Sequence, residues 1–88
     1  MLERHVTVGI PEGLHARPAA LFVKLAGAQP ATVTIRKDGK DPVASNSILA
    51  VMTLGASLGD DVVLATETDD ADAQASLDAL AEYIAAEG

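Results

Sequence analysis

Two kinds of short hydrophobic segment alternate along this chain, and they restrict its fold more than any other feature. Segments that alternate apolar and polar residues, or are apolar for a few residues, predict strands at residues 5–8, 32–36, 40–45 and 61–67. Apolar residues three and four apart predict helices at residues 16–27, 48–54 and 73–84. The order β-α-β-β-α-β-α predicts an α+β fold of two layers, in which three helices cover one face of a largely antiparallel four-stranded sheet.

Turn-forming and cap-forming residues separate these segments. Asp38 and Gly39 predict a two-residue hairpin turn between the second and third strands. Pro42 places the returning strand at an edge or a bulge, because proline has no N–H to donate to a ladder. The acidic residues within 69–72 favour the start of the last helix, because negative charge is stabilised at a helix N-terminus.

The length of the chain, 88 residues, is enough for one domain, which we place at residues 1–88, and for one modest core. The sequence has no cysteine, which excludes disulfide bonds, a thiolate zinc site and a cysteine nucleophile. It has no long apolar run, and charged residues stand near the N-terminus where a signal peptide would be apolar. We therefore expect a cytoplasmic protein without a membrane segment.

Charge is distributed unevenly along the chain. The net charge is −7, but all six lysine and arginine residues precede residue 41, whereas nine of the thirteen acidic residues follow residue 59. A nucleic-acid-binding protein needs clustered lysine and arginine side chains to neutralise phosphates, so this balance argues against nucleic acid as a partner. The acidic segment is typical of a solvated surface, although it could also steer a basic partner.

His15 stands immediately before the predicted helix at residues 16–27, and Arg17 and Pro18 follow it. Proline suits the first turn of a helix, where a missing N–H costs no hydrogen bond. The other first-turn N–H groups have no partner inside the helix, and together with the macrodipole they form an anion site. A neutral imidazole can act as a nucleophile, and Arg17 adds a fixed charge and a fork of donors. A phosphoryl group on His15 would have its charge balanced at this position.

Other interpretations of His15 remain open from the residues alone. A histidine beside an arginine is often only an exposed or helix-capping residue. A metal site is disfavoured, because the other histidine, His5, belongs to a strand and faces away from Val6 and Val8, and no histidine pair has a ligand spacing. Residue types do not exclude a Ser-His-Asp arrangement, but the sequence has no nucleophile elbow.

Two separate segments of this sequence form recognisable motifs, GLHARPA at residues 13–19 and SILAVMTLG at residues 47–55. The first resembles the phosphorylation-site signature of the HPr family, the histidine-containing phosphocarriers of the bacterial sugar phosphotransferase system. The second resembles the serine-site segment of that family, at the usual place in the chain. The resemblance covers essentially all 88 residues. It implies the open-faced sandwich of that family.

The resemblance also implies a function. His15 would accept a phosphoryl group on Nδ1 from phosphorylated enzyme I, which draws it from phosphoenolpyruvate, and would pass it to a histidine on a sugar-specific enzyme IIA. Arg17 would stabilise charge during both transfers. Such a protein is a carrier and not an enzyme, needs no cofactor or metal, and is expected to be a monomer. Two alternatives stay open: an HPr-like paralogue in a nitrogen-regulatory or dihydroxyacetone phosphorelay, and a purely regulatory binding module.

Ser47 has a structural and a regulatory interpretation. As the N-cap of the helix at residues 48–54 it contributes about 1 kcal/mol relative to alanine. In part of the family the matching serine is phosphorylated by an ATP-dependent HPr kinase, which makes such a kinase a further candidate partner. Asn46 stands where family members often carry lysine, and residues 39–47 are one residue longer than usual. Regulation through Ser47 is therefore a hypothesis.

A short helix on a sheet buries only one stripe, so Ile48, Leu49 and Met52 cannot all enter the core. The resemblance implies that Leu49 and Met52 flank the histidine and help to dock both enzyme I and enzyme IIA. It also implies that the surface continues along the first helix. We refer to this predicted surface as the docking patch, and its members are Ala20, Lys24, Ile48, Leu49 and Met52.

Overall fold

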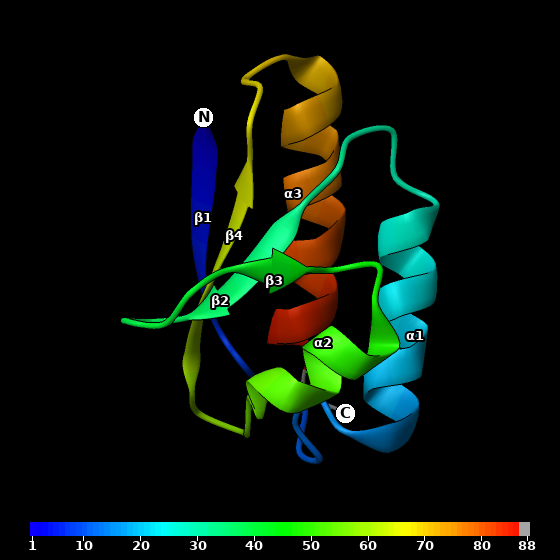
Figure 1. Ribbon diagram of the computed structural model, residues 1–88, viewed down its shortest axis with the longest axis vertical. Helices are drawn as coiled ribbons and strands as arrows, with labels where there is room; N and C mark the ends of the chain where they lie inside the picture. The colour runs from blue at the N-terminus through cyan, green and yellow to red at the C-terminus, as the bar shows by residue number, and fades with distance from the viewer. Residues whose placement is uncertain (87–88) are drawn as a thin grey trace.

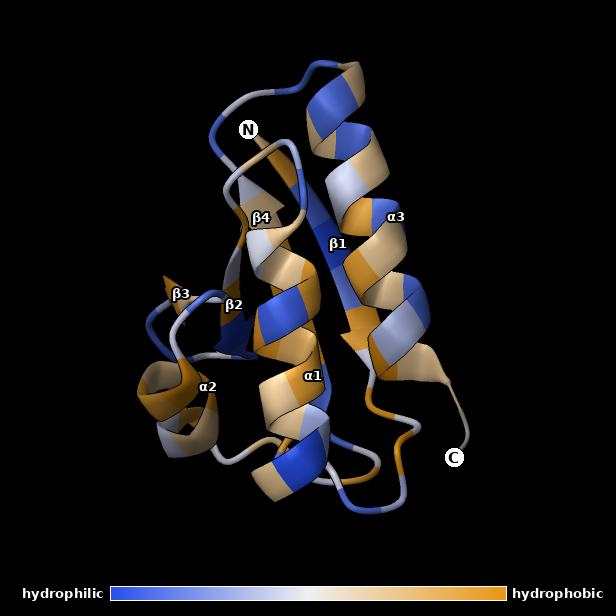
Figure 2. Ribbon diagram, turned by 90° about the vertical axis from the view of Figure 1, so that its right-hand side faces the viewer, coloured by the Kyte–Doolittle hydropathy of each residue, from blue (hydrophilic) through white to orange (hydrophobic). Residues whose placement is uncertain are grey.

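The computed structural model describes residues 1–86, and these form the predicted two-layer arrangement (Figure 1). The elements in chain order are β1 (Leu2–Thr7), α1 (Ala16–Gly27), β2 (Thr34–Lys37), β3 (Val43–Ala44), α2 (Ile48–Leu54), β4 (Asp61–Thr66) and α3 (Ala71–Ala85). The strands pair antiparallel in the order β1-β4-β2-β3. All three helices lie on one face of this sheet (Figure 2), which confirms the predicted fold.

The two faces of the sheet differ in what covers them. His5 of β1 and Arg36 of β2 both pair with Val63 of the central strand β4, so the three residues share the face that carries no helix. His5 is exposed there, as its alternation with Val6 predicts. This face is opposite the one on which α1 packs, and the second histidine is thereby separated from His15.

The core lies between the sheet and the helices. The apolar spacing that predicts α1 and α3 also supplies much of the core, because the residues at that spacing are buried: Ala19 and Phe22 from α1, and Ala73, Leu77, Leu80 and Ile84 from α3. The residues of β2 and β4 on the face that the helices cover complete the core from the side of the sheet. Each fully buried leucine, isoleucine or phenylalanine contributes roughly 1.5–3 kcal/mol relative to an exposed one. None of the helices described for residues 1–86 is long and apolar enough to cross a membrane.

The hairpin between β2 and β3 is wider than its sequence predicts. The N–H of Lys40 donates to the carbonyl of Lys37 at 2.9 Å, so a turn forms at the predicted place. The strands do not pair directly after it, because β3 begins only at Val43. Pro42 cannot donate to a ladder, which explains the delay. The prediction of a strand over residues 40–45 was wrong in length, whereas the prediction of an edge strand is confirmed.

Candidate functional site

His15 occupies the N-cap position of α1 without acting as a cap. Its backbone is extended (φ −124°, ψ 155°), its side chain makes no cap hydrogen bond, and it is exposed. Ser47 and Asp70 at the same position of α2 and α3 do accept hydrogen bonds, from the N–H of Ala50 at 3.4 Å and of Ala73 at 2.9 Å. Among the three helices described, α1 alone therefore begins without a side chain bound to its N–H groups.

The first turn of α1 has backbone donors available to an external acceptor. The N–H groups of Ala16 and Arg17 have no acceptor among residues 1–86. Pro18 carries no N–H, and the N–H of Ala19 donates to the carbonyl of His15 at a long 3.4 Å. Unpaired donors and the positive end of the macrodipole favour an anion at this point. His15, the N-cap residue, is therefore next to a helix end that favours negative charge.

Ala16 follows His15 with a backbone φ of +47°. The left-handed region costs a residue with a Cβ roughly 1–2 kcal/mol. Within residues 1–86 Ala16 is the one residue other than glycine with a positive φ. Strain of this kind persists where the surrounding structure enforces it, and it is concentrated at functional sites. The backbone conformation thus marks the same position as the sequence motif.

Arg17, Ala20 and Lys24 stand on one exposed face of α1 at spacings of three and four residues. Neither Arg17 nor Lys24 forms an ion pair with any residue in the described part of the chain, so both charges remain available to an anion or an acidic partner. Leu21 lies on this face too and is 50% exposed. Sequence analysis missed it, although its spacing of four residues from Arg17 was a usable signal.

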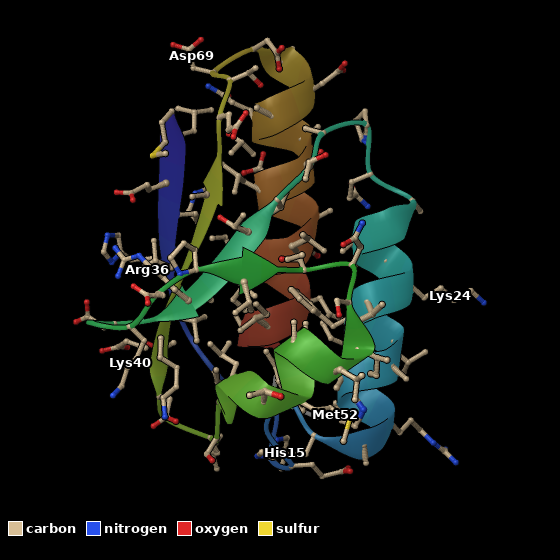
Figure 3. All side chains as sticks on the ribbon, viewed as in Figure 1. His15, Lys24, Arg36, Lys40, Met52 and Asp69 are labelled. Atoms are coloured by element: carbon tan, nitrogen blue, oxygen red, sulfur yellow. The ribbon has the colours of Figure 1, made fainter. Side chains whose placement is uncertain are left out.

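The members of the docking patch on α2 are also accessible to a partner. Leu49 is 76% exposed, Met52 43% and Ile48 38%, whereas Val51 between them is fully buried. One stripe of α2 therefore enters the core and another faces solvent, as the length of the helix predicts. Helices α1 and α2 pack against each other, and Met52 lies at the same end of the molecule as His15 (Figure 3).

Gly13 allows the segment before His15 to approach the loop between α2 and β4. Its φ is +70°, and a Cβ added there would lie 2.6 Å from the carbonyl oxygen of Ala56 and 3.2 Å from Cδ2 of His15. The same loop is fixed by Asp60, whose carboxylate accepts a hydrogen bond from the N–H of Ser57 at 2.9 Å. That hydrogen bond, together with Lys37, holds the pKa of Asp60 below its usual value.

No group of three or more histidine, aspartate or glutamate residues within 1–86 is arranged to hold a metal ion. His5 lies on the uncovered face of the sheet and does not join His15. The arrangement can carry a negatively charged group on an exposed imidazole, beside N–H donors and a guanidinium that have no partner among residues 1–86.

Comparison with known proteins identifies the family. A family model described as "PTS HPr component phosphorylation site" matches residues 2–86. The phosphocarrier protein HPr of Streptomyces coelicolor is 48% identical over 85 residues, which cover 97% of this chain and 89% of that protein. The HPr-like protein Crh of Bacillus subtilis is 40% identical and covers 96% of this chain and 95% of that protein.

Solved structures agree with the sequence comparison. The crystal structure of the phosphocarrier protein HPr from Bacillus anthracis superposes with a TM-score of 0.85 at 41% identity, over 94% of this chain and 95% of that one. Family match, sequence identity and fold thus extend over the same residues. The chain belongs to the HPr family and is a phosphoryl carrier of the phosphotransferase system. The carrier transfers phosphoryl groups without being an enzyme itself.

Proposed function

We propose that His15 is the residue that carries the phosphoryl group, and that Arg17 stabilises its charge during transfer. The observation that supports this most strongly is the uncapped start of α1. His15 is exposed there, the N–H groups of Ala16 and Arg17 have no acceptor among residues 1–86, and the guanidinium of Arg17 has no ion pair in that part of the chain. These donors balance negative charge on an attached phosphoryl group.

In the proposed first transfer, an unprotonated ring nitrogen of His15 attacks the phosphorus atom held by enzyme I. A nitrogen–phosphorus bond forms while the bond between phosphorus and its atom on enzyme I breaks. In the second transfer the bond to His15 breaks as a histidine of enzyme IIA attacks. The resemblance to the family implies Nδ1 as the nitrogen that reacts. Phosphoryl transfer depends mainly on positioning and charge stabilisation, which the helix end and Arg17 would supply.

The docking patch would bind enzyme I and enzyme IIA in turn. Its support is the exposure of Ile48, Leu49 and Met52 beside the buried Val51, and the position of Met52 at the end of the molecule that carries His15. Exposed apolar side chains gathered at one site are typical of protein-binding surfaces. A single patch used by both enzymes would prevent them from binding at the same time, so the carrier must leave one before it meets the other.

The protein would act as a monomer of one domain, at residues 1–88, in the cytoplasm where these partners meet. Similar proteins have been solved as dimers, among them an HPr dimer from Thermoanaerobacter tengcongensis. Sedimentation velocity at micromolar concentration separates the two states. A single species of monomer mass supports the proposal, and a species of twice that mass contradicts it.

A regulatory role is the second candidate function. The observation that favours it is the similarity to Crh of Bacillus subtilis, which is named in a solved structure as a catabolite repression HPr. In this role an ATP-dependent HPr kinase would modify Ser47, whose hydroxyl accepts a hydrogen bond from the N–H of Ala50 at 3.4 Å. A phosphate there would add negative charge beside Leu49 and Met52. Detection of phosphoserine at Ser47 in protein from its native source would support this role, and its absence under every carbon source would leave Ser47 as a helix cap.

The carrier function is tested by mass spectrometry of the intact protein after incubation with enzyme I and phosphoenolpyruvate. Addition of one phosphoryl group, lost again when enzyme IIA is added, supports the proposal. A protein that gains no phosphoryl group would contradict it and favour the binding module. Transfer of the phosphoryl group to one IIA protein but not to others would show which branch of the system the carrier serves.

A further inference from the structure

A hydrogen bond from α3 reaches the first turn of α1. The hydroxyl of Tyr83 donates to the carbonyl oxygen of Pro18 at 2.9 Å, and the bond is partly buried. These residues are 65 positions apart in the sequence, so this contact exists only in the folded protein. Pro18 is buried, and it directly follows Arg17. The bond therefore acts on the same helical turn that carries the proposed phosphoryl site.

This turn lacks the contacts that fix the starts of the other two helices. Ser47 and Asp70 cap α2 and α3, whereas His15 makes no cap hydrogen bond and no acidic residue stands in the first turn of α1. A capping side chain on α1 would occupy the N–H groups that a phosphoryl group must use. A donor to the carbonyl side of the turn has no such disadvantage, because it leaves every N–H unoccupied. Tyr83 is such a donor.

The rest of the molecule holds the Tyr83 hydroxyl in place. Its ring packs against Phe22 of α1 with centroids 6.2 Å apart, and its neighbours Leu80 and Ile84 on α3 are fully buried. Tyr83 and Arg17 line one groove of about 320 Å³. Burial, and the negative charge of Glu12 nearby, raise the pKa of Tyr83 above its usual value, which already lies well above neutral pH, and the hydroxyl therefore stays a donor.

We propose that Tyr83 is a positioning residue for phosphoryl transfer at His15. By holding the carbonyl of Pro18, it would fix the first turn of α1 so that the N–H groups of Ala16 and Arg17 point at the phosphoryl group. Tyr83 does not touch the reacting atoms and acts through the helix alone. This inference rests on the proposed function of His15.

The test compares Tyr83→Phe with Thr66→Val. Both changes remove one partly buried hydroxyl that donates to a carbonyl, at 2.9 Å to Pro18 and at 2.6 Å to Thr68. Thr66 ends β4 shortly before Asp69, which lies at the end of the molecule opposite His15 (Figure 3). Thr66→Val therefore reproduces a loss of stability without a change at the site. The measurements are the rate of phosphorylation by enzyme I and the amide chemical shifts of Ala16 and Arg17 before and after phosphorylation.

We expect Tyr83→Phe to slow phosphorylation about fivefold, the effect of losing one ordinary hydrogen bond that orients the site. We also expect it to reduce the change in the two amide shifts, whereas Thr66→Val leaves both rate and shifts as in the wild type. A wild-type rate and wild-type amide shifts in Tyr83→Phe would overturn the proposal. If the wild-type protein takes no phosphoryl group, the proposed function of His15 fails too. The two failures are distinguishable, because one is seen in the wild type and the other only in Tyr83→Phe.

Discussion

The N–H of Leu14 donates a 2.8 Å hydrogen bond to the carbonyl of Ala56, and this bond joins the segment before His15 to the loop after α2. Leu14 is fully buried, and so is Ala56. The residue that precedes the proposed phosphoryl acceptor is thus anchored in the core, while the acceptor itself is exposed. This hydrogen bond fixes the position of the start of α1 relative to the members of the docking patch that lie on α2.

Replacing Gly13 with alanine should disrupt this contact. A Cβ at Gly13 would lie 2.6 Å from the carbonyl oxygen of Ala56, and the φ of +70° is unfavourable for alanine. We expect Gly13→Ala to lower the free energy of unfolding by about 2–4 kcal/mol, measured by urea denaturation, and to slow phosphorylation. Gly39→Ala is the matched control, because Gly39 has a φ of +83° but no atom within 4 Å of its added Cβ. Equal losses in the two variants would show that the approach to Ala56 contributes nothing.

Replacing Arg17 with alanine should slow transfer while leaving the acceptor atom in place. Loss of a charge-assisted contact costs roughly 1.5–3 kcal/mol, which corresponds to about 10- to 150-fold in rate. Rapid-quench measurements of transfer from enzyme I and to enzyme IIA would detect this change. Arg36→Ala is the control, because it removes the same charge from the uncovered face of the sheet. Unchanged rates in Arg17→Ala would make Arg17 an ordinary solvated residue.

Replacing Ser47 with aspartate should weaken transfer without unfolding the protein. A negative charge at the start of α2 is tolerated by the helix dipole, so the melting temperature should stay close to that of the wild type. The same charge lies beside Leu49 and Met52, whose desolvation on docking becomes more costly. We expect enzyme I to show a higher KM for the Ser47→Asp variant than for the wild-type protein. Ala71→Asp adds an equal charge at the exposed start of α3 and should leave KM unchanged. A similar rise in both variants would attribute the effect to net charge.

The carboxylate of Asp60 should make stability depend on pH in the acid range. The N–H of Ser57, and then Lys37, hold the pKa of Asp60 below its usual value. The folded state therefore favours the charged form, and the resulting stabilisation is present above the pKa of an unfolded aspartate, about 3.9, and is lost as the pH falls through the lower folded value.

Urea denaturation of Asp60→Asn tests this dependence. The variant should be less stable than the wild type at about pH 7, and the difference should shrink as the pH falls through the lowered pKa of the folded Asp60 carboxyl. Asp41→Asn removes the charge of an exposed aspartate that forms no ion pair within residues 1–86. It reports the effect of net charge alone. A difference for Asp60→Asn that does not vary with pH would contradict the assignment.

Local patterns were sufficient to predict most of the fold. The bounds of α1 and α2, the cap at Ser47 and the edge position of β3 all follow from residues within a few positions of each element. The length of β3 did not follow, because pairing depends on where the partner strand lies and on the missing N–H of Pro42.

Features of the site that depend on distant contacts were not predictable in the same way. The motif around His15 gave its position in the chain and at the helix start. The approach of Gly13 to Ala56 and the bond from Tyr83 to the first turn of α1 each depend on segments far apart in the sequence. Pattern within one element carries no information on such contacts.

The central claim is tested most directly by radiolabelled phosphoenolpyruvate and enzyme I. Label is measured on the wild type and on the variants His15→Ala and His5→Ala. His15 is exposed, so His15→Ala should keep the circular dichroism spectrum of the wild type. We expect acid-labile, alkali-stable label on the wild type and on His5→Ala, and none on His15→Ala. Label on His15→Ala to the wild-type extent, absent from His5→Ala, would contradict the assignment of His15 as the phosphoryl acceptor.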